Sequence, residues 1–90
     1  MIFLIDVGNS RTKYVQFDDK TLSTVTQLNN DEFTTDYFSH YFSKAQQVVM
    51  ANVGHVALSE RLAHWCQDQG VCFTEVESEQ QKNTLISAYQ

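Results

Sequence analysis

The stretch Ile5-Asp6-Val7-Gly8-Asn9-Ser10-Arg11-Thr12-Lys13 predicts a strand, a tight turn and a second strand close to the start of the chain. The apolar run Ile2 to Val7 carries a carboxylate, Asp6, near the C-terminal edge of the first strand. Gly8 has no Cβ, so the backbone can turn tightly there and approach a ligand closely. The β-rich run Lys13 to Phe17 would complete a hairpin.

The turn between these strands has the composition of an anion-binding loop. Asn9 and Ser10 tolerate unusual turn dihedral angles, and successive backbone N–H groups in such a turn form a concave site for an anion. Lys13 could place a positive charge against a phosphoryl oxygen. Asp6 would repel a phosphate unless Mg²⁺, held through water, lay between them, so Asp6 is a candidate metal-side residue. An ordinary hairpin turn with Lys13 in solvent is equally compatible with this spacing.

The rest of the chain predicts a third strand, followed by alternating helices and strands. Thr21 to Leu28 has an alternating pattern that favours a strand, and Asn29 could cap a helix with Glu32 three residues later. The apolar face of this helix would be aromatic, formed by Phe33, Tyr37, Phe38, Tyr41 and Phe42. The elements predicted after it are a strand over Gln47 to Val53, a helix with Leu58, Leu62, Trp65 and Cys66 on one face and Gly70 at its end, a strand over Val71 to Val76, and an unfinished apolar pattern over Thr84 to Tyr89.

This order of elements, βββ-α-β-α-β, predicts an α/β domain with a mixed sheet of about five strands. The ribonuclease H-like fold and the actin-like sugar-kinase fold share the order, and both place an acidic residue on the first strand. The order alone therefore indicates a fold and leaves the function open.

Composition and charge exclude several classes of protein. The chain has 90 residues, 42% of them hydrophobic, which suits one small folded domain. Its formal charge of −5 disfavours nucleic-acid binding, because that binding depends on Lys and Arg. The longest apolar run, Met1 to Ile5, is far too short to cross a membrane, and no basic segment precedes it as a signal peptide requires. We therefore expect a cytoplasmic protein without a membrane partner.

Other candidate metal or redox residues have simpler interpretations. The Asp18-Asp19 pair could bind a second metal, but a turn between strands favours Asp for local reasons. Cys66 and Cys72 match no zinc spacing and are predicted to be buried thiols. The histidines lack the spacing of metal ligands, and no role is assigned to His40, His55 and His64.

The hairpin stretch resembles the first phosphate motif of the type III pantothenate kinases, members of the acetate and sugar kinase, heat-shock and actin superfamily. The family pattern is Asp-x-Gly-Asn-(Ser or Thr)-x-x-Lys on a β-hairpin. Its fixed positions are all matched here, by Asp6, Gly8, Asn9, Ser10 and Lys13. The strand and small-residue turn Val49 to Gly54 also fits, and the resemblance extends over essentially the whole chain. It implies that residues 1–90 form a ribonuclease H-like (actin-like ATPase) domain, the N-terminal half of a two-domain kinase whose second domain is absent from this chain.

The function implied by this resemblance is ATP-dependent phosphorylation of pantothenate to 4′-phosphopantothenate, the first step of coenzyme A biosynthesis. The implied cofactors are ATP, Mg²⁺ and a monovalent cation, K⁺ or NH₄⁺, and a homodimer is expected for the full-length protein. The general-base Asp of the family lies in a Gly-x-Asp-Arg motif that would follow Gln90. The 90-residue chain alone is therefore expected to be inactive, with no catalytic residue of its own.

The resemblance also implies which residues bind the ligands. Asp6 would hold Mg²⁺ through water, and Tyr89, in Ser87-Ala88-Tyr89, resembles a tyrosine that lines the pantothenate pocket. A core aromatic at the end of a strand is an equally good interpretation of Tyr89. The residues expected to bind ATP are Asp6, Val7, Gly8, Asn9, Ser10, Arg11, Thr12 and Lys13.

Two other functions fit parts of the sequence. A non-catalytic nucleotide-binding or regulatory module of the same fold would keep the loop without the chemistry. A ribonuclease H-like nuclease would use Asp6 in a two-metal cluster. The nuclease is disfavoured because the other predicted strands, Lys13 to Phe17 and Gln47 to Val53, carry no carboxylate, and because Lys13 and the negative net charge suit it poorly.

Overall fold

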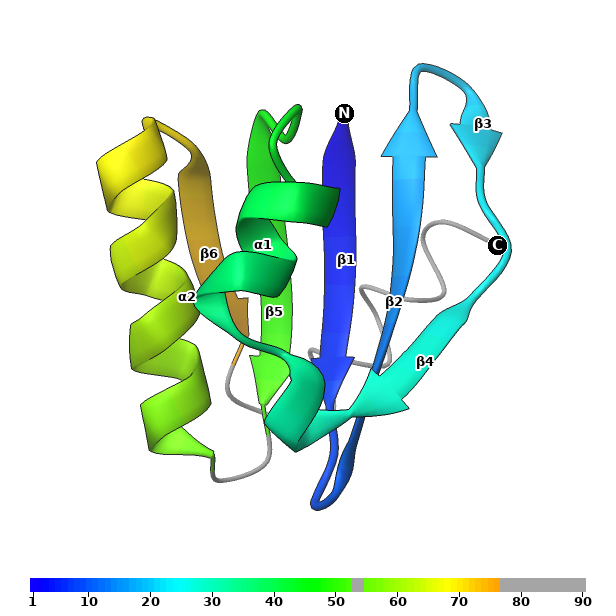
Figure 1. Cartoon of the computed structure of the whole chain (residues 1–90). Helices are drawn as coiled ribbons and strands as arrows, with labels where there is room; N and C mark the ends of the chain where they lie inside the picture. Colours follow the sequence, from blue (N-terminus) through cyan, green and yellow to red (C-terminus); the bar gives the residue numbers. More distant parts are fainter. Residues whose placement is uncertain (53–54, 77–90) are drawn as a thin grey trace.

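The computed structural model describes residues 1–52 and 55–76, which form a mixed sheet with two α-helices (Figure 1). The elements of the described part are β1 (Ile2–Val7), β2 (Arg11–Asp18), β3 (Thr21–Leu22), β4 (Thr26–Asn29), the 3₁₀ turn η1 (Asn30–Glu32), α1 (Thr35–Tyr41), β5 (Gln47–Asn52), α2 (Val56–Gln69) and β6 (Cys72–Val76). The predicted pattern over Thr84 to Tyr89 lies outside the described residues, as does Tyr89.

The six strands lie in the order β3-β2-β1-β5-β6, with β4 also paired to β2. β1 runs antiparallel to β2 and parallel to β5, and β5 runs parallel to β6. This arrangement confirms the predicted mixed α/β fold. β1 is the central strand, and its carboxyl end lies beside that of β5 because Val7 and Asn52 are register partners.

The predicted single strand over Thr21 to Leu28 is wrong, because it is two short strands that both pair with β2. Leu22 pairs with Phe17, whereas Thr26 pairs with Tyr14. The chain therefore advances four residues from Leu22 to Thr26 while β2 covers only three, from Phe17 to Tyr14. The additional residue interrupts the ladder in the manner of a bulge. Ser23 bridges the gap, since its N–H donates to the Gln16 carbonyl and its Oγ accepts from the Gln16 N–H.

The first helix begins later than predicted. Asn29 ends β4 and makes no side-chain capping bond; η1 follows it. α1 begins after Thr34, whose Oγ1 accepts the N–H of Tyr37 at 3.4 Å and so acts as the N-cap. The predicted aromatic face is otherwise confirmed at Phe33, Phe38 and Phe42, which are all fully buried, while Tyr41 is 54% exposed.

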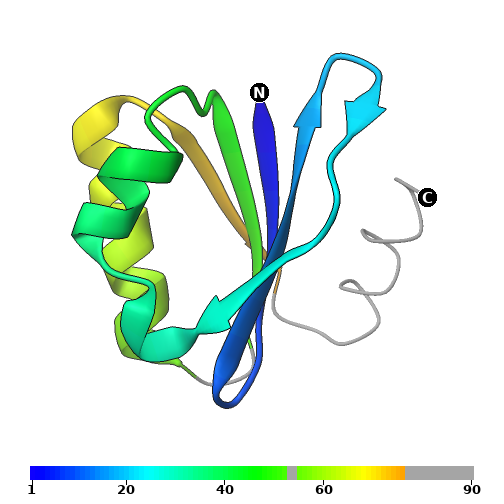
Figure 2. The same ribbon diagram turned by 45° about the vertical axis from the view of Figure 1, so that its right-hand side comes forward.

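Both helices cover the same face of the sheet (Figures 1 and 2). The alternation of β1 sends every second side chain towards them, and the aromatic side chains of Phe33, Phe38 and Phe42, in and beside α1, fill the space between. The rings of Phe33 and Phe38 meet edge to face, with their centroids 4.7 Å apart. The ring of Phe38 also packs against Trp65 of α2, with a centroid distance of 5.9 Å. The core residues are Phe3, Ile5, Val7, Tyr14, Phe33, Phe38, Phe42, Val48, Met50, Leu58, Leu62, Trp65 and Cys66.

The second helix confirms its prediction closely. Leu58, Leu62 and Trp65 are buried on one face, and Gly70 ends the helix with φ 71°. Glycine suits that position because a Cβ is strained in the left-handed region. Cys66 is buried as predicted, but Cys72 is exposed, so the prediction of two buried thiols is half wrong.

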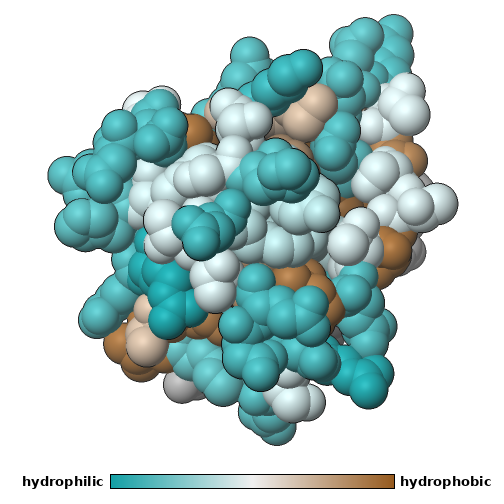
Figure 3. Space-filling view, in the orientation of Figure 1, coloured by the Kyte–Doolittle hydropathy of each residue, from teal (hydrophilic) through white to brown (hydrophobic). Residues whose placement is uncertain are grey.

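The outer face of the helices is largely hydrophilic, with only small separate apolar patches (Figure 3). Among the described residues, no helix combines the length and hydropathy needed to cross a membrane.

Candidate phosphate-binding site

The strand alternation divides the predicted motif between the two faces of the sheet. Val7 and Thr12 are register partners with fully buried side chains on the helix side. Asp6 and Lys13 are also register partners, so their side chains lie next to each other on the opposite face. Asp6 is half-buried and Lys13 is exposed. A ligand at this hairpin would therefore meet the side chains of Asp6 and Lys13, and only the backbone of Val7 and Thr12.

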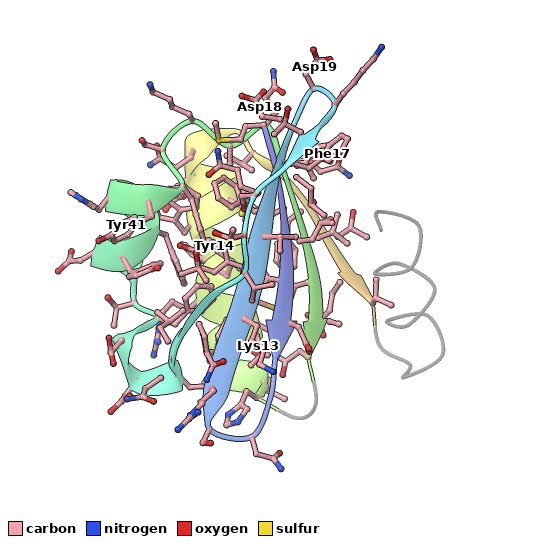
Figure 4. The ribbon with its side chains drawn as sticks, turned by 90° about the vertical axis from the view of Figure 1, so that its right-hand side faces the viewer. Lys13, Tyr14, Phe17, Asp18, Asp19 and Tyr41 are labelled. Carbon is pink, nitrogen blue, oxygen red and sulfur yellow. The ribbon has the colours of Figure 1, made fainter. Side chains whose placement is uncertain are left out.

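Lys13 lies near the hairpin end of β2, whereas Asp18 and Asp19 lie at its opposite end (Figure 4). Asp19 has φ 58° in the turn that leads to β3. Asp and Asn enter this left-handed region more readily than most residues. The structure therefore supports the turn interpretation of Asp18-Asp19 and separates this pair from Asp6.

The loop Gly8–Arg11 joins the last register pair of the hairpin. The Gly8 N–H donates to the Arg11 carbonyl at 2.8 Å, and a Cβ on Gly8 would lie 3.2 Å from that same oxygen. A side chain at Gly8 would crowd that oxygen, so glycine favours this close approach. Among the described residues, only Asp19 and Gly70 have a positive φ. The loop thus differs from the tight two-residue hairpin turns, which require positive φ.

Two residues outside the hairpin bind the loop carbonyls. Asn30, at the start of η1, donates from Nδ2 to the Gly8 carbonyl at 3.0 Å and from its backbone N–H to the Ser10 carbonyl at 3.0 Å. His55, directly before α2, has Nε2 2.7 Å from the Asn9 carbonyl oxygen. Because a carbonyl oxygen only accepts, Nε2 carries the proton of this bond.

Both residues are held by partners of their own. Thr12 Oγ1 donates to Asn30 Oδ1 at 2.6 Å. Asn52, the last residue of β5, donates from Nδ2 to the His55 carbonyl at 2.8 Å and accepts the His55 N–H on Oδ1 at 3.0 Å. The sequence pattern indicated neither Asn30 nor His55. A signal was available for His55, because polar residues that follow the carboxyl ends of neighbouring parallel strands meet at one edge. Asn30 follows β4, which pairs antiparallel with β2, so this rule does not reach it.

The metal chemistry open to this site is limited. Among the described residues, no group of three or more His, Cys, Asp or Glu side chains is placed to hold a metal ion. Mg²⁺ that keeps its waters and binds nucleotide phosphates needs only one or two protein carboxylates. Asp6, whose oxygens are hard ligands and whose neighbour is Lys13, fits that requirement.

Two hollows on the described surface lie away from the loop. One of about 360 Å³ includes Tyr14, Tyr37 and Tyr41, and another of about 380 Å³ includes Arg61 and Trp65. In the first, the Tyr14 and Tyr37 hydroxyls share a hydrogen bond of 2.7 Å. Burial, together with this bond, raises the pKa of Tyr37, so its hydroxyl stays protonated at neutral pH. Neither of these two hollows includes a residue of the loop.

No protein-family model matches the chain. The chain is 57% identical over all 90 residues to a type III pantothenate kinase of Colwellia psychrerythraea strain 34H. It covers 36% of the length of that relative, at its N-terminal end. The chain is thus similar over its whole length to the N-terminal region of a type III pantothenate kinase and spans about a third of that relative.

Proposed function

We propose that this chain supplies the first phosphate-binding loop of a pantothenate kinase, which transfers the terminal phosphoryl group of ATP to pantothenate and forms 4′-phosphopantothenate. The observation that carries this proposal is the 57% identity over the whole chain to a protein named type III pantothenate kinase. The product would enter coenzyme A biosynthesis, and the enzyme would work in the cytoplasm.

The geometry of Asp6 and Lys13 supports the phosphate-loop role. Phosphoryl transfer depends mainly on positioning and on stabilisation of negative charge. Lys13 is exposed at the hairpin end of the sheet and can place its ammonium group against a phosphoryl oxygen. Asp6 beside it would bind Mg²⁺ through water, and the ion, when bound, would neutralise phosphate charge. Asn9, Ser10 and Arg11 are exposed in or beside the loop and would contribute backbone N–H groups.

The remaining parts of the enzyme are proposed to lie in sequence that follows this segment. We propose that residues 1–90 form the N-terminal half of a two-domain actin-like kinase, since the relative is much longer than this chain. The second domain would supply the general base, most of the adenosine site and the homodimer surface. Tyr89 would line the pantothenate pocket, and K⁺ or NH₄⁺ would be a further cofactor.

Substitution of the two charged residues in the full-length protein tests the proposal. Asp6→Ala and Lys13→Ala should each lower kcat/KM for ATP by about 100-fold or more, as expected when a group that stabilises developing charge is removed. Asp18→Ala and Lys20→Ala are matched controls, because they remove the same charges at the other end of the same hairpin strand and its turn. ADP release should be measured with and without pantothenate, and thermal unfolding should be measured for every variant.

Normal turnover in both Asp6→Ala and Lys13→Ala would refute the proposed role of the loop. Binding of Mg-ATP by the full-length protein, without transfer to pantothenate, would favour the regulatory nucleotide-binding module instead.

A further inference from the structure

Three consecutive carbonyl groups of the hairpin loop, those of Gly8, Asn9 and Ser10, all receive donors from outside the hairpin. Asn30 binds the first and the third, and His55 binds the second, with donor–acceptor distances of 3.0, 3.0 and 2.7 Å. The two contacts made by side chains join residues that are 22 and 46 positions apart in the chain. We refer to Asn30 and His55 together as the loop bracket.

The bracket determines where the amide groups of the loop point. In a trans peptide unit, the carbonyl of one residue and the N–H of the next residue lie on opposite sides. No cis peptide bond occurs among the described residues. The carbonyls of residues 8–10 are directed at the bracket, so the N–H groups of Asn9, Ser10 and Arg11 are directed away from it. Carbonyl oxygens repel a phosphate and N–H groups attract it, so this orientation favours an anion.

The bracket is itself anchored to the sheet. Thr12 is fully buried, and its hydroxyl fixes the side-chain oxygen of Asn30, which leaves Nδ2 to face Gly8. Asn52 ends β5 next to Val7 of β1 and holds the backbone of His55 through two hydrogen bonds. The loop, which lacks the positive φ angles of a self-sufficient tight turn, therefore takes its shape from β2, η1 and the start of α2.

We propose that Asn30 and His55 are positioning residues of the phosphate loop. They do not touch the phosphate; they hold three carbonyls away from it and so present the amide groups of residues 9–11 to it. The phosphate-binding part of this inference rests on the proposed function, whereas the effect on loop order stands apart from it.

The test uses substitutions that remove single donors in the full-length protein. Asn30→Asp keeps the oxygen that accepts from Thr12 but replaces Nδ2, which donates to Gly8 and lies 3.4 Å from His55 Nε2, with a negatively charged oxygen. His55→Ala removes the donor to Asn9, and His55→Gln restores an N–H that can reach the same carbonyl. His64→Ala is the control, because the His64 side chain is 78% exposed on α2 and faces Asp68.

Two quantities should be measured for each variant: amide hydrogen exchange of the peptide covering residues 7–13, by mass spectrometry, and the dissociation constant of Mg-ATP. In His55→Ala, the bonded amides of this peptide, such as the Gly8 N–H, should exchange about tenfold faster, and Mg-ATP binding should weaken about tenfold, as expected for one lost hydrogen bond. Asn30→Asp should have effects at least as large, because it also places a negative charge beside the loop. Exchange of residues 60–69 in α2 should not change. His55→Gln should recover most of both effects, which a general loss of packing would not allow.

Each outcome separates the bracket from the proposed function. If the parent protein binds Mg-ATP but His55→Ala and Asn30→Asp match His64→Ala in both measurements, the bracket is refuted and the proposed function stands. If the loop exchanges faster in both variants but the parent binds no Mg-ATP, the proposed function fails and the effect of the bracket on loop order stands. If His55→Gln behaves like His55→Ala, the donor to Asn9 is not the cause and the assignment of His55 is overturned.

Discussion

Gly8→Ala should impair ATP use while leaving the fold almost as stable as before. The new Cβ would lie 3.2 Å from the Arg11 carbonyl oxygen, closer than an ordinary van der Waals contact, so that oxygen must move by a few tenths of an ångström. The same oxygen accepts the Gly8 N–H at 2.8 Å, so the hydrogen bond that closes the loop must lengthen or bend. Gly8 does not have a positive φ, so the alanine causes no left-handed strain.

The expected magnitudes differ for stability and for function. One weakened, solvent-accessible hydrogen bond should lower the free energy of unfolding by less than about 1 kcal/mol. A misplacement of about 1 Å in a phosphate site can cost about 100-fold in rate, so a shift of a few tenths of an ångström should cost about five- to tenfold in kcat/KM for ATP.

Gly70→Ala is the matched comparison: it should lower stability and leave ATP use unchanged. Gly70 has φ 71°, and no atom lies within 4 Å of its hypothetical Cβ, so the only cost is backbone strain of about 1 kcal/mol. Gly70 ends α2, away from the loop, so kcat/KM for ATP should not change.

Two assays check this pair of predictions. Urea unfolding of the 90-residue chain can be followed by the fluorescence of its one tryptophan, Trp65, which is buried on the inner face of α2 against Phe38. ATP turnover should be measured in the full-length protein. An unchanged kcat/KM for Gly8→Ala, or a larger loss of stability for Gly8→Ala than for Gly70→Ala, would show that the close approach at Gly8 does not control the loop.

The remaining predictions concern the core and the thiols. Phe38→Ala should lower the free energy of unfolding by about 3–5 kcal/mol, because the ring is fully buried, whereas Tyr41→Ala, on the same helix but 54% exposed, should cost less than about 1 kcal/mol; equal midpoints of urea unfolding would contradict this packing. Burial, reinforced by Cys72, raises the pKa of the Cys66 thiol to about 11, so the reactive thiolate of Cys66 is scarce at pH 8 and increases only as the pH approaches that value. At pH 8, a thiol reagent should therefore label the exposed Cys72 first and Cys66 only after urea is added. Mass spectrometry of the labelled peptides measures this order, and labelling of Cys66 before urea is added would contradict its burial.

Elements with a clear local pattern could be predicted from the sequence. The run Ile2 to Val7, the strand from Gln47 and the helix that ends at Gly70 are all in the structure because hydrophobic periodicity and a left-handed glycine are local properties. The predicted third strand and the Asn29 cap were wrong for a non-local reason. Their residues make hydrogen bonds with β2 and with the hairpin loop that compete with the local preference.

By itself, the sequence determined the spacing that brings Asp6 and Lys13 together, since the register of a hairpin follows from the type and length of its turn. It also placed Gly8 in the turn, whereas the close approach of Gly8 to the Arg11 carbonyl oxygen was decided by the structure. Only the tertiary structure decided that Asn30 and His55 bind the loop. Asn30 lies at the start of η1 and His55 directly before α2. The pairing of β4 with β2 and of β5 with β1 brings both residues to the loop. A contact between segments 46 residues apart depends on the packing of the whole sheet, and no pattern within the hairpin encodes it.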